Sequence, residues 1–214
     1  MDTYLKNIIN SIKIHLNNNK PGEKAQKLMM PEGRILSPEY QVKPIPSAVL
    51  IALFIDKNQL YFPIIRRPVY NGMHSGQIAF PGGKRDSSDS NLIHTALREA
   101  NEEIGIIPDE VEVLGTLTQL YIPITNMNVL PVVGYLKTKP SYILNKHEVD
   151  AIYNINIKDI FDFDKKITET WNLRHNNINV PFYNINKQKI WGATAMIISE
   201  FEQLLRGFSK FSEL

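Results

Sequence analysis

The chain has 214 residues, of which 43% are hydrophobic and 21% charged, so it is long enough for one globular domain with a buried core. Its formal net charge of +2 is too small to indicate nucleic acid or a membrane surface as the main partner. The absence of cysteine excludes disulfides, zinc–thiolate centres and cysteine nucleophiles. No apolar run approaches the roughly 20 residues of a membrane span, and no secretory leader is evident, so we expect a cytoplasmic protein.

The N-terminal part of the chain is expected to differ from the rest. Residues 3–18 carry apolar side chains at helical spacing, which predicts an amphipathic helix. Residues 19–46 show little periodicity, as expected for a loop or arm that leads into the fold. The sequence therefore predicts an N-terminal helix and arm, residues 1–46, followed by a main domain, residues 47–208.

Strands mixed with a few helices make up the predicted main domain, which indicates an α/β fold. Runs rich in Val, Ile and aromatic residues predict strands over 47–55, 59–67, 78–80, 111–122 and 128–137. Residues 147–160 are expected to form a strand and a short helical turn, and VPFYNI and KIWG are expected to be extended. Helices are predicted over 90–104 and 193–208. Loops are predicted at 68–77 and 81–90, and residues 161–180 are expected to be irregular.

The helix predicted over 90–104 carries two stripes of side chains. At about 100° per residue, Glu99, Glu102 and Glu103 face the same side. The apolar stripe lies about 125° away around the axis; it consists of Ile93, Ala96, Leu97, Ala100 and Ile104. Asp89 or Ser90 is expected to cap the start of the helix, and Gly105 to end it in a left-handed turn.

Three carboxylates this close together need a physical reason. Each like-charge pair destabilises a helix by roughly a few tenths of a kcal/mol, and the C-terminal end of a helix disfavours negative charge. A bound divalent cation would remove both penalties, and Mg²⁺ prefers carboxylate oxygens and shares its sites with substrate phosphates. Arg98 can also reach Glu102 one turn later and offset part of the repulsion. The alternative interpretation is a solvated acidic face.

The sequence around this helix resembles the signature of the Nudix hydrolases: Gly, five residues, Glu, seven residues, then Arg-Glu-U-x-Glu-Glu-x-Gly-U, where U is apolar. REANEEIGI, residues 98–106, matches the second half, and Gly83 stands in the place of the first glycine. Asp89 replaces the first glutamate, and eight residues rather than seven separate it from Arg98. The resemblance covers roughly residues 47–205. It implies an α/β/α sandwich with a mixed β-sheet between helices.

Within this family, the chain is most similar to the coenzyme A pyrophosphatases. Asp89 and the extra residue resemble that subgroup, and so does an upstream element in which Arg67, Gly76 and the run Phe80-Pro81-Gly82-Gly83 match in register. The positions that differ from this element are Ile65, Pro68 and Gly72. Gly72 stands where the subgroup has a second arginine. The segments HEVDAIYNI and IWGATAMII also look like those of the subgroup.

The resemblance implies a pyrophosphohydrolase that uses Mg²⁺, with Mn²⁺ as an alternative ion. Glu99 and Glu103 would be the main metal ligands, and Glu102 would be a ligand or the general base. Arg98 would orient the glutamates, and the glycines at 82–83 would let the backbone approach the substrate. Coenzyme A would yield 3′,5′-ADP and 4′-phosphopantetheine.

Further candidate residues have competing interpretations. Arg66 and Arg67 could hold phosphates, although a surface pair is an equal interpretation for Arg66. His74 could contact the substrate, although a lone loop histidine is more often structural or solvated. Glu148 could supply a general base from a distal loop, with a surface acid as the alternative.

Aromatic residues near the predicted strands also have two interpretations. Tyr121 and Tyr135 could stack on adenine or pack between strands. Trp191 and the apolar residues that follow it are expected to pack the last helix into the core.

The resemblance leaves several functions open. Coenzyme A or a derivative is the favoured substrate, and the alternatives are ADP-ribose, NADH or a nucleoside triphosphate. A Nudix-fold module that binds a nucleotide without cleaving it is a further alternative, but degenerate modules usually lose the glutamates that this chain retains. The expected partner is a small-molecule nucleotide, with no nucleic acid and no membrane, and the sequence leaves a homodimer open.

Overall fold

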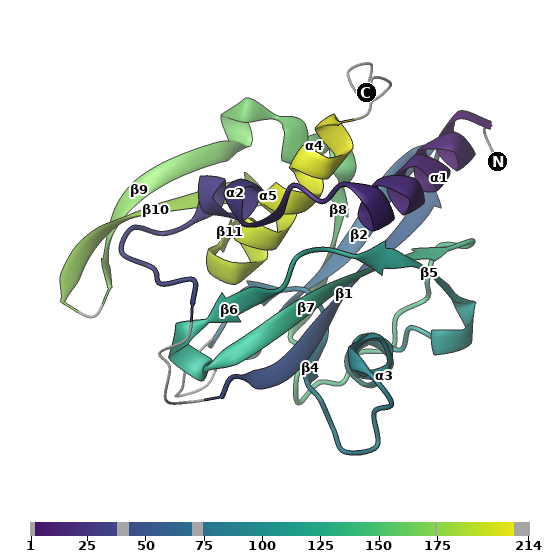
Figure 1. Ribbon diagram of the computed structural model, residues 1–214, viewed down its shortest axis with the longest axis horizontal. Coiled ribbons are helices and arrows are strands. Elements are labelled where there is room, and N and C mark those ends of the chain that lie inside the picture. The colour runs from purple at the N-terminus through teal and green to yellow at the C-terminus, as the bar shows by residue number, and fades with distance from the viewer. Residues whose placement is uncertain (1–2, 38–42, 70–74, 174, 208–214) are drawn as a thin grey trace.

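The computed structural model describes residues 3–37, 43–69, 75–173 and 175–207. Within these residues, an eight-stranded mixed sheet forms the centre of the fold (Figure 1). Its long central strands, β1 (Ile45–Asp56) and β7 (Met127–Leu136), run parallel to each other. Most of their side chains are buried, because the sheet is covered on both faces.

The other strands of this sheet pair antiparallel to β1, β2 or β7. A tight turn joins β1 to β2 (Gln59–Arg66), and Lys57 and Asn58 both have positive φ there, as a two-residue hairpin requires. β5 (Val111–Thr116) and β6 (Leu120–Ile122) pair with β7, and β8 (Ala151–Asn156) pairs with β2. Two short strands are β3 (Ile78–Ala79), paired with β2, and β4 (Gly82–Lys84), paired with β1.

Helices cover both faces of the sheet, as Figure 1 shows. On one face, α3 (Leu92–Ile104) packs Ala96, Ala100 and Ile104 against the apolar side chains of β1 and β7. On the other face, α1 (Thr3–Asn18) and α5 (Gly192–Arg206) enclose a second apolar cluster. The predicted α/β/α sandwich with a mixed sheet is therefore confirmed. No helix in the described part of the chain is long and apolar enough to span a membrane.

Short helical segments connect these elements. The α-helical ones are α2 (Gly22–Gln26) and α4 (Ile157–Phe161). The 3₁₀ turns are η1 (Lys27–Met29), η2 (Pro108–Glu110), η3 (Pro123–Thr125) and η4 (Phe163–Lys165). The strand and helical turn predicted within 147–160 are present as β8 and α4.

A second, three-stranded sheet contacts α5. It consists of β9 (Lys166–Leu173), β10 (Asn176–Ile185) and β11 (Gln188–Trp191), in the order β11-β10-β9. The expectation that residues 161–180 are irregular is therefore wrong. The half-buried side chains of β9 alternate with exposed ones, but the many asparagines around the turn hide this period in the sequence.

Three local predictions also need correction. The segment predicted as a loop over 81–90 contains β4, whose glycines lie against β1. The strand predicted over 111–122 is interrupted between β5 and β6, and the pairing register already shifts near Gly115. The cap of α3 is Asn91, which accepts a hydrogen bond from the His94 N–H at 2.9 Å; Asp89 has a different role, described below. Gly105 ends the helix at φ 76°, as predicted.

The N-terminal arm packs against the domain through contacts with α5 and β10. Its Gly22 N–H and Gln26 side chain donate hydrogen bonds to the buried Glu200 carboxylate of α5, at 3.2 and 2.8 Å. Farther along, Glu32 and Asn179 of β10 are joined by two hydrogen bonds through their backbones and the Glu32 carboxylate. The expectation of an arm without regular structure is wrong over α2 and η1. The domain boundary at residue 46 stays a prediction.

Candidate active site

The site forms where β4 passes the C-terminal half of α3. The N–H of Gly82 donates a hydrogen bond to Glu103 Oε2 at 2.9 Å. A Cβ atom on Gly83 would lie 2.5 Å from Glu99 Oε2, so the Glu99 carboxylate rests directly on the Gly83 backbone. A Cβ atom on Gly82, where φ is +154°, would lie 2.3 Å from the carbonyl oxygen of Ala48. Gly82 thus lets β4 lie close to the β1 backbone, and Gly83 leaves the space that the Glu99 carboxylate occupies.

Glu103 is almost fully buried, with 1% of its surface exposed. Burial raises the pKa of Glu103 to about 7, although the Arg67 guanidinium and the Gly82 N–H oppose the rise. Burial also raises the pKa of Glu99, and the negative charge of Glu148 contributes to both shifts. The protein thus compensates the charged forms of the two carboxylates only in part, a condition that favours binding of a cation.

Arg98 holds the acidic side chains of this region in place. It donates to Glu102 Oε2 and to Glu99 Oε1, each at 2.8 Å. It also donates to Asp89 Oδ1 at 2.9 Å and to the carbonyl oxygen of Lys84 at 3.2 Å. The predicted contact between Arg98 and Glu102 is therefore formed, and one guanidinium links β4, α3 and the loop between them.

Asp89 anchors this network from inside the protein. Its side chain is fully buried and accepts hydrogen bonds from the Thr95 hydroxyl at 2.8 Å and the Asp86 N–H at 2.9 Å. The bonds from Arg98 hold the pKa of Asp89 well below its usual range. Asp89 is thus a charged partner of Arg98 instead of the helix cap that the sequence suggested.

The loop after β7 brings Glu148 to the end of α3. The Asn145 N–H donates to the carbonyl oxygen of Glu103 at 2.9 Å and satisfies one of the free carbonyls at the helix C-terminus. Glu148 accepts a hydrogen bond from the Asn145 side chain at 3.3 Å. Its charge acts on Glu99 and Glu103, as their pKa shifts show. Glu102 is 52% exposed and turns to Arg98.

The two neighbouring arginines have different surroundings. Arg67 donates to the carbonyl oxygen of Gly82 at 3.5 Å, and its Nη2 lies 3.9 Å from Glu103 Oε1. Arg66 instead forms an ion pair with Asp150, and both side chains are exposed. The distance from Arg66 Nη2 to Asp150 Oδ2 is 2.6 Å. His74, the other candidate from this region, lies outside the described residues.

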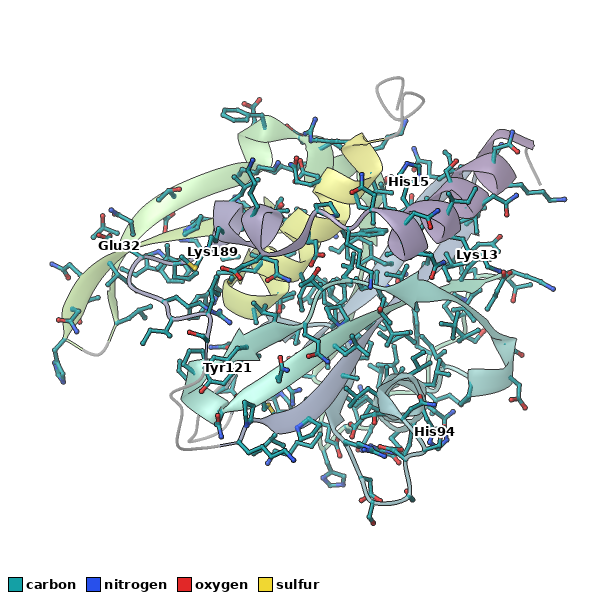
Figure 2. The ribbon with its side chains drawn as sticks, in the orientation of Figure 1. Lys13, His15, Glu32, His94, Tyr121 and Lys189 are labelled. Atoms are coloured by element: carbon teal, nitrogen blue, oxygen red, sulfur yellow. The ribbon has the colours of Figure 1, made fainter. Side chains whose placement is uncertain are left out.

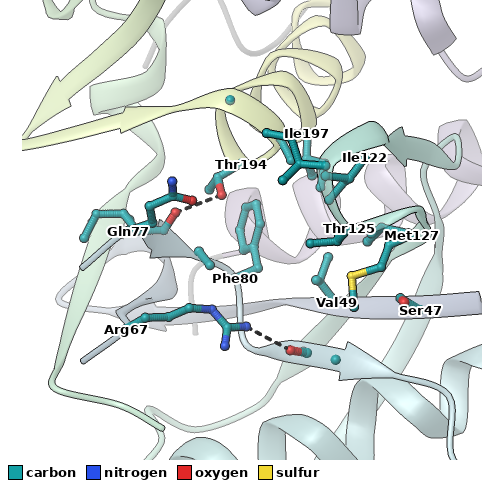
Figure 3. A pocket seen from close by; sticks show the side chains of 18 of the residues that line it. Ser47, Val49, Arg67, Gln77, Phe80, Ile122, Thr125, Met127, Thr194 and Ile197 are labelled. Atoms are coloured by element: carbon teal, nitrogen blue, oxygen red, sulfur yellow. Dashed lines mark hydrogen bonds between the residues drawn. The ribbon is translucent and has the colours of Figure 1, made fainter. Parts of the chain in front are cut away.

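A cavity of about 260 Å³ opens beside the two glycines (Figure 3). Most of its wall is apolar and includes Val49, Ile78, Phe80, Ile122, Met127, Val129 and Ile197. Polar side chains also line it: Arg34, Ser47, Arg67, Gln77, Thr125 and Thr194. Arg67 and Thr125 lie on opposite sides of the cavity in Figure 3. Its volume is just below the ~300–1,000 Å³ of common ligand pockets, so it suits part of a nucleotide derivative.

The aromatic candidates divide between core and cavity. Tyr135 is 4% exposed and packs in the core, and the Tyr121 hydroxyl donates to Asn126 Oδ1 at 3.0 Å. Met196 and Phe201 of the last helix are buried, as predicted. Trp191 instead lines the cavity, so the expectation of core packing does not hold for it.

The donor set suits a hard divalent cation. Mg²⁺ is usually held by one or two carboxylates together with substrate phosphates, and Glu99 and Glu103 present such a pair beside an open cavity. Across residues 3–37, 43–69, 75–173 and 175–207, no three acidic or histidine side chains converge on a single ion position. The protein pair alone would thus leave coordination positions for water and phosphate.

Comparison with known proteins assigns the chain to a family. The family described as NUDIX domain matches residues 44–159, which is more than half of the chain. The chain belongs to the Nudix family. A protein of Pectobacterium atrosepticum named uncharacterized Nudix hydrolase NudL is 34% identical over 137 residues, covering 64% of this chain and 71% of that protein. A protein of the same name from an Enterobacter species is 34% identical over 154 residues, covering 72% and 79%.

Solved structures share the fold. A MutT protein from Methanosarcina mazei superimposes with a TM-score of 0.53 at 18% identity, covering 80% of this chain and all of that one. A complex of a C. elegans Ap4A hydrolase gives 0.51 at 16% identity, covering 77% and 99%. As a Nudix family member, the protein is a hydrolase of phosphorus anhydrides in nucleoside diphosphate derivatives, and a divalent metal ion is the general cofactor of this family.

Two residues at the cavity were not identified from the sequence, and a third was assigned to the core. Arg34 lies in the arm, where no periodicity indicates which side chains point inward. Thr125 lies in η3, a turn with a Pro-Ile-Thr-Asn sequence that suggests only a change of direction. Trp191 was named in the sequence but assigned to the core. It directly precedes Gly192 and the last helix, and this position at the start of a helix was the available signal that it differs from the buried residues that follow.

Proposed function

We propose that this protein hydrolyses the pyrophosphate bond of coenzyme A or one of its derivatives with Mg²⁺, giving 3′,5′-ADP and 4′-phosphopantetheine. The observation that carries the proposal is the pairing of Glu99 and Glu103 against the backbone of residues 82–83. Arg67 lies beside this pair and lines an apolar cavity. The arrangement offers carboxylates for a cation, a guanidinium for phosphate and an apolar wall for the organic part of the substrate.

Each acidic residue has a proposed role. Glu99 and Glu103 hold Mg²⁺, or Mn²⁺ in its place, and Glu102 is a further ligand or the general base. A bound divalent ion neutralises phosphate charge and lowers the pKa of bound water. Arg98 orients Glu99 and Glu102 through its two 2.8 Å hydrogen bonds. Asp89 holds Arg98 in that position.

Glu148 is the second candidate for the general base. Its loop is hydrogen-bonded to the end of α3, and its charge contributes to the pKa shifts of Glu99 and Glu103. The replacements Glu148→Gln and Glu102→Gln separate the two candidates. Loss of the base lowers kcat by on the order of 100-fold or more and leaves metal affinity unchanged. Loss of a metal ligand weakens metal binding as well.

Arg67 is the proposed phosphate ligand on the protein. It is partly exposed to the cavity, and its hydrogen bond to Gly82 leaves other guanidinium N–H groups for a substrate oxygen. Arg66 is a secondary proposal, because it would have to leave Asp150 to contact substrate. His74 stays a proposal based on the sequence.

The choice of coenzyme A rests on the upstream element, including the run FPGG and Arg67, and on the altered spacing before Arg98. The relatives named NudL are consistent with a hydrolase and name no substrate. Gly72 in place of the second arginine favours an alternative: ADP-ribose, NADH or a nucleoside triphosphate as the substrate.

A substrate panel tests the proposal. Purified protein is incubated with coenzyme A, acetyl-coenzyme A, ADP-ribose, NADH and ATP, with Mg²⁺ or with EDTA, and the products are separated by HPLC. We expect 3′,5′-ADP to form fastest from coenzyme A or its thioester, and only with Mg²⁺. Faster cleavage of ADP-ribose, NADH or ATP would replace the coenzyme A proposal with the alternative. No cleavage of any compound under Mg²⁺ or Mn²⁺ would contradict the proposed reaction.

A further inference from the structure

The cavity contains a second arginine that comes from the N-terminal arm. Arg34 lines the cavity, and its Nη2 donates to the carbonyl oxygen of Tyr121 at 3.0 Å. Its Nε is buried and has no hydrogen-bond partner in the described part of the protein. Burial lowers the pKa of Arg34 to about 10. No carboxylate among the described residues pairs with Arg34, and a partly buried guanidinium without such a partner is costly, which indicates that an anion completes it.

A second unpaired polar atom lies in the same cavity wall. The hydroxyl oxygen of Thr125 is buried and, within the described residues, has no partner. Thr125 follows β6, which also carries the carbonyl acceptor for Arg34. Two polar groups without partners at one cavity are rarely left so in folded proteins, where nearly all buried polar atoms are hydrogen-bonded. Both residues line the cavity, so a ligand bound there can lie next to both side chains.

This pair is separate from the catalytic carboxylates. Arg67, which contacts Gly82 and Glu103, lies on the side of the cavity opposite to Thr125 (Figure 3). Arg34 is bonded to Tyr121 of β6, the strand directly before Thr125, so we infer that it lies on the Thr125 side of the cavity, away from Arg67. A substrate that matches both arginines carries a second anionic group outside its pyrophosphate.

Two contacts hold Arg34 in position. Glu32, two residues before it, accepts a hydrogen bond from the Asn179 N–H of β10, and the Arg34 side chain donates to the carbonyl oxygen of Tyr121 in β6. Figure 2 shows Glu32 of the arm and Tyr121 of β6 on the same side of the molecule. A side chain fixed before the ligand arrives loses little entropy on binding, so its contribution to affinity is large.

We propose that Arg34 and Thr125 bind a phosphate monoester on the ribose of the substrate, remote from the bond that is cleaved. This inference rests on the proposed function, because coenzyme A carries such a group at its 3′ position, whereas ADP-ribose and NADH do not. Arg34 is accordingly a specificity-determining residue that selects 3′-phosphorylated adenosine derivatives. The N-terminal arm, which lies before the family's own signature, supplies this selection.

Binding of the nucleotide product tests the inference without any need for turnover. Isothermal titration calorimetry measures the affinity of 3′,5′-ADP and of 5′-AMP, which lacks the 3′-phosphate, for wild-type protein and for Arg34→Gln. Charge-assisted hydrogen bonds of this kind change affinity by on the order of 10- to 100-fold. We expect wild type to prefer 3′,5′-ADP by that factor. Arg34→Gln is expected to lose the preference and to bind 5′-AMP as wild type does.

Three further variants complete the test. Lys20→Gln removes an exposed cation from the same arm and is expected to keep the preference. Arg34→Lys retains the charge and is expected to keep part of it. Thr125→Val replaces the hydroxyl by a methyl group and leaves the arm unchanged, so it reports on the site even if Arg34→Gln disturbs the arm. We expect it to reduce the preference several-fold.

Two outcomes would overturn the inference. One is equal binding of 3′,5′-ADP and 5′-AMP by wild type. The other is a preference that survives both Arg34→Gln and Thr125→Val. These outcomes are distinct from failure of the proposed function. A preference that depends on Arg34, without turnover of coenzyme A, retains this inference and removes the proposed reaction; turnover of coenzyme A without such a preference does the reverse.

Discussion

Replacement of Glu103 by glutamine should stabilise the metal-free protein at alkaline pH. Glu103 is almost fully buried, and burial raises its pKa from an ordinary 4.5 to about 7. Between these two values the folded protein binds more protons than the unfolded chain. The contribution of Glu103 to the stability of the fold is therefore fully present below about pH 4.5 and is lost as the pH rises through 7.

The size of the effect follows from the shift. A change of about 2.5 in pKa corresponds to about 3 kcal/mol between the two limits, since each unit is worth about 1.36 kcal/mol. Glutamine has no charge to bury, and its side-chain oxygen can still accept the hydrogen bond from the Gly82 N–H. The free energy of unfolding of Glu103→Gln relative to wild type should thus rise by about 3 kcal/mol from pH 4.5 to pH 8.

Urea unfolding in EDTA at pH 4.5, 6, 7 and 8 measures the difference in free energy of unfolding between the variant and wild type. Groups that titrate in both proteins contribute equally to both and cancel in this difference. Adding Mg²⁺ at pH 8 should stabilise wild type and leave Glu103→Gln nearly unchanged, because a bound ion compensates only the charged side chain. A difference between the proteins that does not change with pH, or a variant less stable than wild type at pH 8, would refute the reasoning.

Two further predictions concern the residues that position the site. Asp89→Asn should lower the free energy of unfolding by about 3 kcal/mol, because it leaves Arg98 without its buried partner. Urea unfolding measures this loss. The control Asp109→Asn, at an exposed position, should show no comparable loss. Gly83→Ala should reduce Mg²⁺-dependent kcat by on the order of 100-fold, because its Cβ would displace the Glu99 carboxylate. Steady-state kinetics measures the second effect, and an unchanged kcat would contradict the contact between Gly83 and Glu99.

Signals that lie within one element could be read from the sequence. The apolar and acidic stripes of α3, the left-handed turn at Gly105 and the amphipathic α1 each depend on spacing along a single helix. The two central strands are also visible as apolar runs, although their parallel pairing was not predicted. The family signature adds the glycines beside the helix, and the structure brings Gly83 against Glu99.

Signals that depend on contacts distant in the sequence could not be read. The position of Asp89 in the sequence suggests a helix cap. In the structure its buried carboxylate accepts hydrogen bonds from Thr95 and Arg98, and Asn91 caps the helix. The hairpin of β9 and β10 was missed because asparagines mask its alternation. Arg34 was missed because only the packing of the arm on α5 and β10 turns it to the cavity.

Direct measurement of metal binding tests the central claim, that Glu99 and Glu103 form the divalent-ion site of this hydrolase. The free Mn²⁺ signal in electron paramagnetic resonance is titrated with wild type, with Glu99→Gln/Glu103→Gln and with the exposed control Glu110→Gln. We expect wild type and the control to bind Mn²⁺ alike, and the double variant to bind on the order of 100-fold more weakly, as loss of two charged ligands requires. Unchanged Mn²⁺ affinity in the double variant would contradict the account.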